Sequence, residues 1–314
     1  MKWVSNQANK FVELIEQRQN DICGALSSID NTPFQIDEWN RPGGGGGNTR
    51  ILESSTFEKA GVNTSRVFGK ITPSEVPMFT QLVQKVDSHF QISKETQFFA
   101  TGISLVIHPK NPFIPTVHAN YRYFEINTNE SMLWWMGGGA DLTPYYLIES
   151  DIQLFHQTHY ELCEAYKSGT YHQFKDACDQ YFYLPHRKET RGVGGIFFDY
   201  LNQDYAPQYE LVSNLSAGFI DAYIPIVKRQ KNRAFSEKER QWQELRRGRY
   251  AEFNLLYDRG TLFGLKTNGR IESILMSMPP QAAWKYDFVP SPESEEGKIL
   301  AVLKSPRQWI FENE

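Results

Sequence analysis

The chain has 314 residues, and 33 basic against 37 acidic side chains give it a formal net charge of −4. That length suits one large domain, and interspersed charges without a basic field argue against a nucleic-acid partner. Hydrophobic residues make up 40% of the chain, enough for a sizeable core, yet no apolar run is long enough for an integral membrane segment.

The first predicted element is an amphipathic helix over residues 3–28, where apolar side chains recur near a 3.6-residue period. This segment has no apolar core of the kind that signal peptides carry. The three cysteines of the chain are widely spaced and form no CxxC pair, which argues against disulfides, zinc ribbons and iron–sulfur clusters. We therefore expect a protein of a reducing compartment, the cytoplasm.

A glycine-rich stretch follows at residues 30–50, and we predict a loop there. Five consecutive glycines let a backbone approach a ligand closely, and Arg41 and Arg50 flank them, so this loop is either simply mobile or faces an anion. It is not a phosphate-binding P-loop, because no Lys-Ser/Thr pair follows the glycines. We expect further β-structure over 51–72 and a helix over 74–90.

The segment 98–125 predicts two β-strands joined by a proline-rich turn. In the second strand, 116–126, alternate side chains point to opposite faces of a sheet. One face then carries Thr116, His118, Asn120, Arg122 and Phe124, with Ser104, Val106 and His108 of the first strand in phase with one another. If the strands pair, this face suits an anionic, hydrogen-bonding ligand; the alternative is a half-polar strand with a solvated face.

The rest of the chain alternates short strands with helices. A strand over 131–136 is expected to end at the three glycines 137–139, with a turn at 141–144. The Asn-Gly pair at 268–269 predicts a hairpin turn. Helices are expected at 150–168, 170–184, 206–229, 233–250 and 293–303, and strands at 253–257 and 273–278. Together these elements predict an α+β fold, a single domain in which helices cover an antiparallel sheet.

Titratable side chains supply several candidate sites. The seven histidines include no HExxH motif, but a cluster of them in space would bind a metal or move protons. Converging guanidinium groups would suit a polycarboxylate, since each binds a carboxylate through two parallel hydrogen bonds; the alternative, above all for the helical Arg240, Arg246 and Arg247, is solvated surface charge. Asp258, at the end of an apolar run, is either a base or hydrogen-bonding group, or the first residue of a turn or cap. The candidate arginines are Arg122, Arg246, Arg247, Arg249, Arg259 and Arg270.

Long motifs in the chain resemble the oxygen-dependent coproporphyrinogen III oxidase family. They include FFATGISLVIHPKNPFIPTVHANYRYFE, GGGADLTPYY, QYFYLPHRKETRGVGGIFFDYLN and RRGRYAEFNLLYDRGTLFGLKTNGRIESILMSMPP. The resemblance covers residues 40–312 of a single domain, 1–314, and the N-terminal helix within 1–30 is less diagnostic. It implies a large antiparallel sheet with helices on both faces, and a homodimer formed through about 250–284. It also implies an oxidoreductase of haem biosynthesis, which converts the ring A and B propionates of coproporphyrinogen III to vinyl groups.

The resemblance also implies roles for individual residues. His118 matches the family's proposed proton donor. Asp258 would contact the pyrrole N–H groups, and Arg259 would pair with a propionate. Asn268 stands where relatives often carry a glycine. The positions that match substrate contacts are Ser104, Asn120, Tyr121, Arg122, Asn268, Gly269 and Arg270.

Cofactors follow from the same resemblance. The reaction needs molecular oxygen and no flavin or nicotinamide, which agrees with the absence of dinucleotide motifs. His108, His118, His156 and His186 match histidines proposed as metal ligands in some bacterial relatives, whereas other members work without metal. A non-catalytic tetrapyrrole carrier is the alternative function. The radical-type, oxygen-independent enzyme is disfavoured, because the chain has no CxxxCxxC motif.

Overall fold

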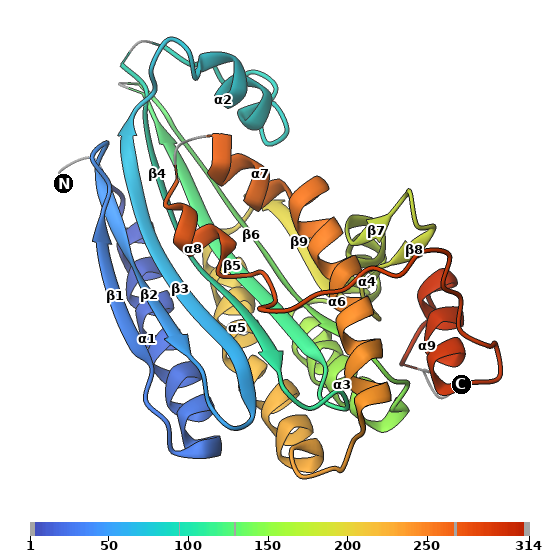
Figure 1. The fold of residues 1–314 in the computed structure, drawn as a ribbon. Coiled ribbons are helices and arrows are strands. Elements are labelled where there is room, and N and C mark those ends of the chain that lie inside the picture. The colour runs from blue at the N-terminus through green and yellow to red at the C-terminus, as the bar shows by residue number, and fades with distance from the viewer. Residues whose placement is uncertain (1–3, 94, 129, 267–268, 311–314) are drawn as a thin grey trace.

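A seven-stranded antiparallel sheet forms the centre of the molecule (Figure 1). The computed structural model describes residues 4–93, 95–128, 130–266 and 269–310. The strands follow the spatial order β1-β2-β3-β4-β5-β6-β9, so that six of them lie in space as they do in sequence. They are β1 (Gln35–Asn40), β2 (Gly45–Leu52), β3 (Phe57–Lys70), β4 (Gln97–Pro109), β5 (Thr116–Asn127), β6 (Met132–Thr143) and β9 (Gly195–Leu201). A separate ribbon pairs β7 (Tyr183–Leu184) with β8 (Glu189–Thr190).

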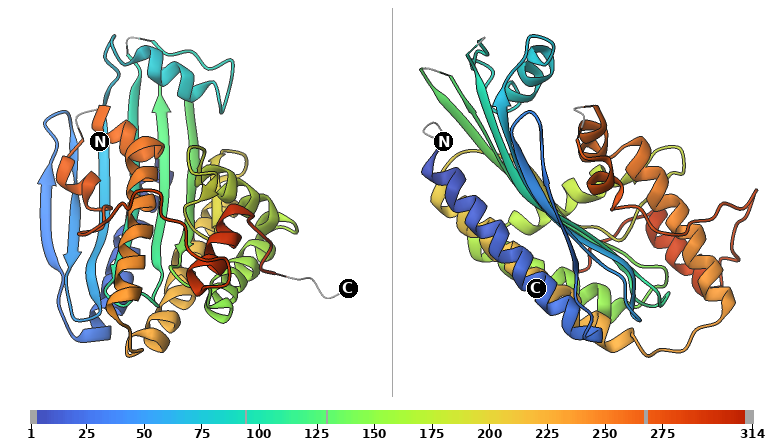
Figure 2. Two further views of the ribbon diagram at one scale, coloured as in Figure 1. Left: turned by 45° about the vertical axis from the view of Figure 1, so that its right-hand side comes forward. Right: turned by 60° about the vertical axis from the view of Figure 1, so that its left-hand side comes forward.

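Helices cover both faces of this sheet, as the right-hand view of Figure 2 shows. One face packs against α1 (Asn6–Asp30) and α5 (Tyr205–Gln230), with α3 (Glu149–Tyr166) beside α5. The other face lies under α6 (Glu237–Leu256), α7 (Arg259–Lys266) and α8 (Ile271–Leu275). The remaining helices are α2 (Val76–Val83) at one end of the strands, α4 (Thr170–Tyr181) against β9, and α9 (Glu295–Lys304) beside β8. This arrangement confirms the α+β prediction.

The alternation predicted for β5 is confirmed by the environment of its side chains. Tyr121 and Tyr123 are buried toward α1 and α5, where the Tyr121 hydroxyl donates to the Leu215 carbonyl at 3.1 Å. His118 and Arg122 lie on the opposite face, toward α6 and α7, and are only half-buried. Most of the apolar core therefore lies on the α1 and α5 side, and the α6 to α8 side keeps a polar surface.

Two glycine-rich segments lie in strands, contrary to prediction. The stretch predicted as a loop at 30–50 forms the β1–β2 hairpin, with Gly44 in its turn at a φ of +110°. At Gly45 a Cβ atom would stand 2.0 Å from the Arg66 carbonyl oxygen, so close strand pairing requires glycine there. Likewise β6 continues through 137–139 to Thr143, and the predicted end at 136 and turn at 141–144 are wrong. Partner strands on both sides outweigh the weak strand propensity of glycine.

Two predicted strands near the C-terminus are helical instead. The run at 253–257 continues α6, where Phe253 and Asn254 are buried but Leu255 and Leu256 are exposed, as the period of a helix requires. The strand predicted at 273–278 overlaps α8, and the described elements on either side of the Asn-Gly pair are the helices α7 and α8, not the two strands of a hairpin. The helix expected over 74–90 is shorter, Val76–Val83. Within the described ranges, no helix is both long and apolar enough to cross a membrane.

Candidate active site

His118 belongs to a buried hydrogen-bonded chain on the α6 to α8 face of the sheet. The register of β5 with β6 sets it opposite Asp141, and its Nδ1 lies 2.8 Å from the Asp141 Oδ1. Arg191 donates from Nη2 to both oxygens of Asp141 at 2.9 and 2.8 Å, and both of these charged side chains are 2% exposed. The Arg191 guanidinium lies 4.1 Å from the ring centroid of Phe182 and 4.4 Å from that of Tyr250.

This chain fixes the orientation of the imidazole. Burial alone would raise the pKa of Asp141, but the guanidinium of Arg191 and the His118 imidazole hold it below its ordinary value. The carboxylate therefore stays ionised and occupies Nδ1 of His118, which leaves Nε2 as the nitrogen for a ligand. His118 itself is 21% exposed, so a molecule on this face of the sheet can reach it.

A cluster of arginines lies next to His118 along the same face. Arg122 donates from Nη1 to the Asn120 Oδ1 at 2.9 Å, and its Nη2 lies 2.9 Å from Oδ2 of Asp199 in β9. Arg259, the first residue of α7, places its own Nη2 3.6 Å from the same Asp199 oxygen. Ser104 is the cross-strand neighbour of Asn120. Four residues predicted to bind substrate or act on it, Ser104, Asn120, Arg122 and Arg259, are thus brought to one region.

Asp258 caps the start of α7. Its Oδ2 accepts the Thr261 N–H at 2.7 Å, and its Oδ1 accepts the Tyr181 hydroxyl at 2.9 Å. Burial and the adjacent Asp258 carboxylate raise the pKa of Tyr181 to about 12, so the phenol remains a donor. The backbone N–H of Arg259 in turn donates to the Tyr181 oxygen at 3.1 Å. Of the two alternatives left open for Asp258, the geometry supports the cap, which sets the position of Arg259.

The other predicted substrate contacts lie elsewhere. The side chain of Tyr121 points to the α1 and α5 face and is buried there, as the alternation of side chains along β5 predicts, and its match to a substrate contact stays a prediction. Arg270 lies 2.5 Å from Oδ2 of Asp37 in β1, the edge strand opposite β9. Gly269 donates its N–H to the Gly264 carbonyl at 2.8 Å. Asn268 lies outside the described residues.

The histidines matched to metal ligands are held by separate partners. His108 is fully buried between the Thr116 hydroxyl at 3.1 Å and the Ser277 carbonyl at 2.9 Å, and burial lowers its pKa to about 3. His156 bonds to Tyr171 at 2.8 Å, and His186 to Glu252 at 2.7 Å. Among the residues that the structure describes, no three His, Cys, Asp or Glu side chains are arranged to hold a metal. The proposed four-histidine set therefore does not fit a metal ion.

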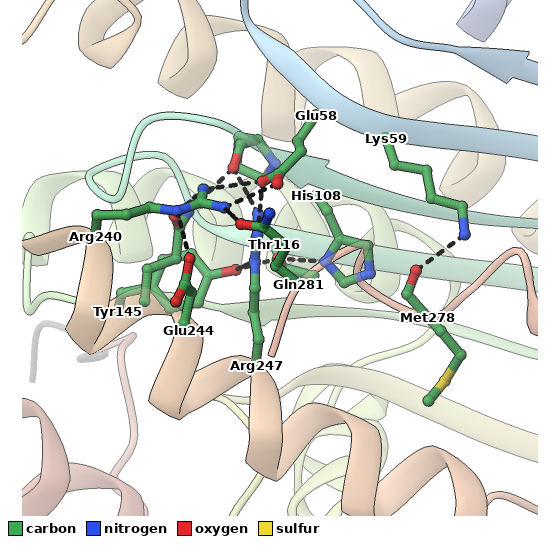
Figure 3. A network of polar contacts seen from close by, with 12 residues as sticks. Glu58, Lys59, His108, Thr116, Tyr145, Arg240, Glu244, Arg247, Met278 and Gln281 are labelled. Atoms are coloured by element: carbon green, nitrogen blue, oxygen red, sulfur yellow. Dashed lines mark hydrogen bonds and ion pairs between the residues drawn. The ribbon is translucent and has the colours of Figure 1, made fainter. Parts of the chain in front are cut away.

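A polar network fastens the helical cover to the sheet. Figure 3 shows Glu58 of β3 reaching Arg240 and Arg247 of α6, at 2.8 and 2.6 Å. Burial would raise the pKa of Glu58, but the two guanidinium groups lower it to about 2. Lys59 donates to the Met278 carbonyl at 3.1 Å and so fixes the chain that follows α8. The Arg247 side chain is thus buried and paired within the protein, and it is not available to a ligand as a candidate arginine.

Arg246 and Arg249 are committed in the same way. Arg246 pairs with Glu189 at 2.7 Å, and Arg249 lies 3.2 Å from Glu252. Of the six candidate arginines, Arg122, Arg259 and Arg270 are the most exposed, with side chains 36%, 47% and 29% exposed, whereas Arg249 is 19% exposed. All three carry an acidic partner.

Sequence reasoning missed four members of this site: Asp141, Arg191, Asp199 and Tyr181. One signal was available, because Asp141 and Asp199 each lie within an apolar strand, where aspartate is rare and needs a partner. Arg191 and Tyr181 carried no comparable signal. Their importance comes from contacts with residues far away in the chain.

An ionised aspartate behind a partly exposed histidine, beside outward-facing arginines, is an arrangement suited to an anionic ligand. The family model described as coproporphyrinogen III oxidase matches residues 10–309. The chain is 48% identical over 313 residues to the oxygen-dependent coproporphyrinogen-III oxidase of Drosophila melanogaster, covering 97% of this chain and 79% of that protein. It is 46% identical over 310 residues to coproporphyrinogen-III oxidase 1, chloroplastic, of Arabidopsis thaliana, covering 96% and 79%. The chain belongs to the coproporphyrinogen III oxidase family.

Proposed function

We propose that this protein catalyses the oxygen-dependent oxidative decarboxylation of coproporphyrinogen III to protoporphyrinogen IX. In each of two steps, one propionate, one oxygen molecule and one proton become a vinyl group, carbon dioxide and hydrogen peroxide. Family membership over residues 10–309 is the observation that carries the proposal. The anion-binding face formed by His118, Arg122 and Arg259 supports it.

The chemistry of the substrate matches this face. Its four propionates are ionised near neutral pH, because carboxylate pKa values lie near about 4. Arg122 and Arg259 offer guanidinium donors to a propionate, and a fixed pose brings the reacting carbon to a constant place. Each step consumes one proton. His118 is the group suited to supply it, since Asp141 holds its ring through Nδ1 and the side chain is 21% exposed toward the ligand face.

An aerobic turnover assay tests the proposal. Purified protein and coproporphyrinogen III are incubated in air, and the product is oxidised and read as protoporphyrin fluorescence. His118→Asn is expected to bind coproporphyrin III with the affinity of the wild type but to lose about 100-fold or more in turnover. Binding without turnover by the wild-type protein would instead establish the alternative, a tetrapyrrole carrier.

For cofactors, we propose molecular oxygen as the sole co-substrate and no organic cofactor. A divalent metal is a separate question, and the scattered histidines speak against a four-histidine site. Metal analysis of active protein, with and without a chelator, tests this. Full turnover by metal-free protein supports the proposal, and loss of turnover that added metal restores would contradict it.

We also propose a homodimer that forms through residues 250–284, in the cytoplasm. Exposed apolar side chains gather in that part of the chain, as expected for an interface. They are Leu255, Leu256, Phe263, Leu265, Ile271 and Trp284. Light scattering after size exclusion tests the dimer, and a monomer at micromolar concentration would contradict it. All three cysteines are buried and free, which suits a reducing compartment, and cell fractionation tests the location.

A further inference from the structure

Asp199 has one carboxylate oxygen facing two guanidinium groups from distant parts of the chain. Its Oδ2 lies 2.9 Å from Nη2 of Arg122 in β5 and 3.6 Å from Nη2 of Arg259 in α7. We infer that Asp199 is a positioning residue, which aligns these two arginines to grip one propionate of the substrate. The inference rests on the proposed function and adds to it a residue that does not react.

The backbone of β9 is distorted at the position that directs Asp199 toward the arginines. Met136 pairs with Leu201 and Gly138 with Phe198, so two residues of β9 lie opposite one residue of β6. This is a β-bulge, a device that re-aims a side chain. Tyr200, the second bulged residue, has a left-handed φ of +60°, and its N–H donates to the Asp199 Oδ1 at 3.1 Å. A strained non-glycine residue of this kind persists only where the surrounding structure enforces it.

The residue opposite the bulge makes room for the ion pair. A Cβ atom at Gly137 would stand 2.6 Å from Oδ1 of Asp199 and 2.8 Å from Nη2 of Arg122. Any side chain there would displace one partner or both. The bulge, the left-handed Tyr200 and the glycine thus all serve the same contact, between Asp199 and Arg122.

The charges explain why an acidic residue fits a site for acidic ligands. Two guanidinium groups directed at one propionate repel each other, and a shared carboxylate offsets that repulsion. A guanidinium has five N–H donors. In the described part of the chain, Arg122 directs Nη2 to Asp199 and donates from Nη1 to Asn120. Its other N–H groups are left for a ligand. Arg259 is also aligned by ring faces, 4.7 Å from the centroid of Tyr181 and 5.4 Å from that of Phe197.

Replacing Asp199 distinguishes two effects on ligand binding: the alignment of Arg122 and Arg259, and the simple attraction between their charges and an anionic ligand. Asp199→Asn makes the face more positive by one charge, so attraction alone would strengthen the binding of a polycarboxylate. Alignment demands the opposite. We expect Asp199→Asn to weaken coproporphyrin III binding, measured by tryptophan quenching, and to lower kcat/KM about 10- to 100-fold. Asp199→Glu keeps the charge and is expected to recover part of both. Glu149→Gln, which removes an exposed partner of Arg307, is the control and should change neither.

A double-mutant cycle then shows whether Asp199 acts through the arginines. In an Arg122→Gln, Arg259→Gln background, the Asp199→Asn change should have almost no further effect on binding. Full additivity, or binding by Asp199→Asn equal to that of the wild type, would overturn the inference. Thermal melts check that each variant is folded. If Asp199→Asn is not folded, Asp199→Glu takes its place in the cycle.

The readouts keep the two ideas distinguishable. If the wild type binds coproporphyrin III without turnover, the proposed function fails, while weakened binding by Asp199→Asn would still uphold the alignment of the arginines. If the wild type turns over normally and Asp199→Asn does too, the inference fails and the proposed function stands.

Discussion

Asp141→Asn removes the carboxylate charge that lies between Arg191 and His118. The resulting loss in the free energy of unfolding follows from the burial of the Asp141–Arg191 ion pair. Both Asp141 and Arg191 are 2% exposed, and losing one partner of such a pair costs about 3–5 kcal/mol. At about 2.1 cal/mol/K per residue, unfolding of 314 residues has an entropy on the order of 0.7 kcal/mol/K. The melting temperature should therefore fall by about 4–7 °C. Turnover should fall about 100-fold or more, since His118 loses its support.

The pH dependence of this loss has a definite sign. Because the pKa of Asp141 is lowered in the folded protein, its contribution is present above its ordinary value of 3.8 and disappears as pH falls through the lower, folded value. Urea denaturation should show a constant gap between wild type and variant from pH 7 to 5, which closes in stronger acid. Asp21→Asn, which breaks a partly exposed pair with Arg18 within one helix, is the control and should cost at most about 1 kcal/mol. A variant that melts with the wild type and turns over normally would refute the reasoning.

Three further predictions concern the cover, the buried histidines and the bulge. Glu58→Gln leaves the buried Arg247 without its carboxylate and should lower the free energy of unfolding by about 3 kcal/mol in urea; an unchanged midpoint would contradict this. Burial lowers the pKa of His108 to about 3 in the folded protein, whereas in the unfolded chain this histidine has its ordinary pKa of 6.5. As the pH falls below 6.5, the unfolded chain therefore binds a proton that the folded protein does not. The free energy of unfolding should fall by about 2 kcal/mol for this group at pH 5. Denaturation at pH 7 and 5 should therefore show a smaller loss for His108→Gln than for the wild type, and equal losses would exclude this role. Gly137→Ala should reproduce the weaker coproporphyrin III binding of Asp199→Asn, and normal binding would remove the steric argument.

Local sequence patterns predicted the sheet well where each strand had one polar and one apolar face. The period of two in β5 placed His118, Asn120 and Arg122 together correctly, because burial of alternate residues imposes that period. The same rule places Tyr121 on the opposite face, where the structure has it. Its match to a substrate contact comes from the family resemblance alone and stays a prediction.

Other features depend on contacts that no local pattern contains. The run at 253–257 has the composition of a strand, but α6 continues through it because Phe253 packs beside Tyr181 and Phe182, more than 70 residues earlier. The three glycines predict that a strand ends at 136, although pairing with β5 carries β6 onward to Thr143. The place of Asp258 in the chain makes a cap one of its two predicted roles, but no local pattern identifies Tyr181 as its partner. Tertiary contacts, not propensity, decided each of these cases.

The spatial order of the strands has a consequence for the way the protein folds. Each of the strands β1 to β6 pairs with the strand that follows it in the sequence. The sheet can therefore grow by one strand at a time while the chain is being synthesised. The cover, α6 to α8, is synthesised roughly a hundred residues after β6, and Arg259 and Arg270 arrive with it. Until then the face of the sheet that carries His118 is not covered by helices. The catalytic apparatus is therefore among the last parts to become complete, and an incomplete chain would have the sheet without the activity.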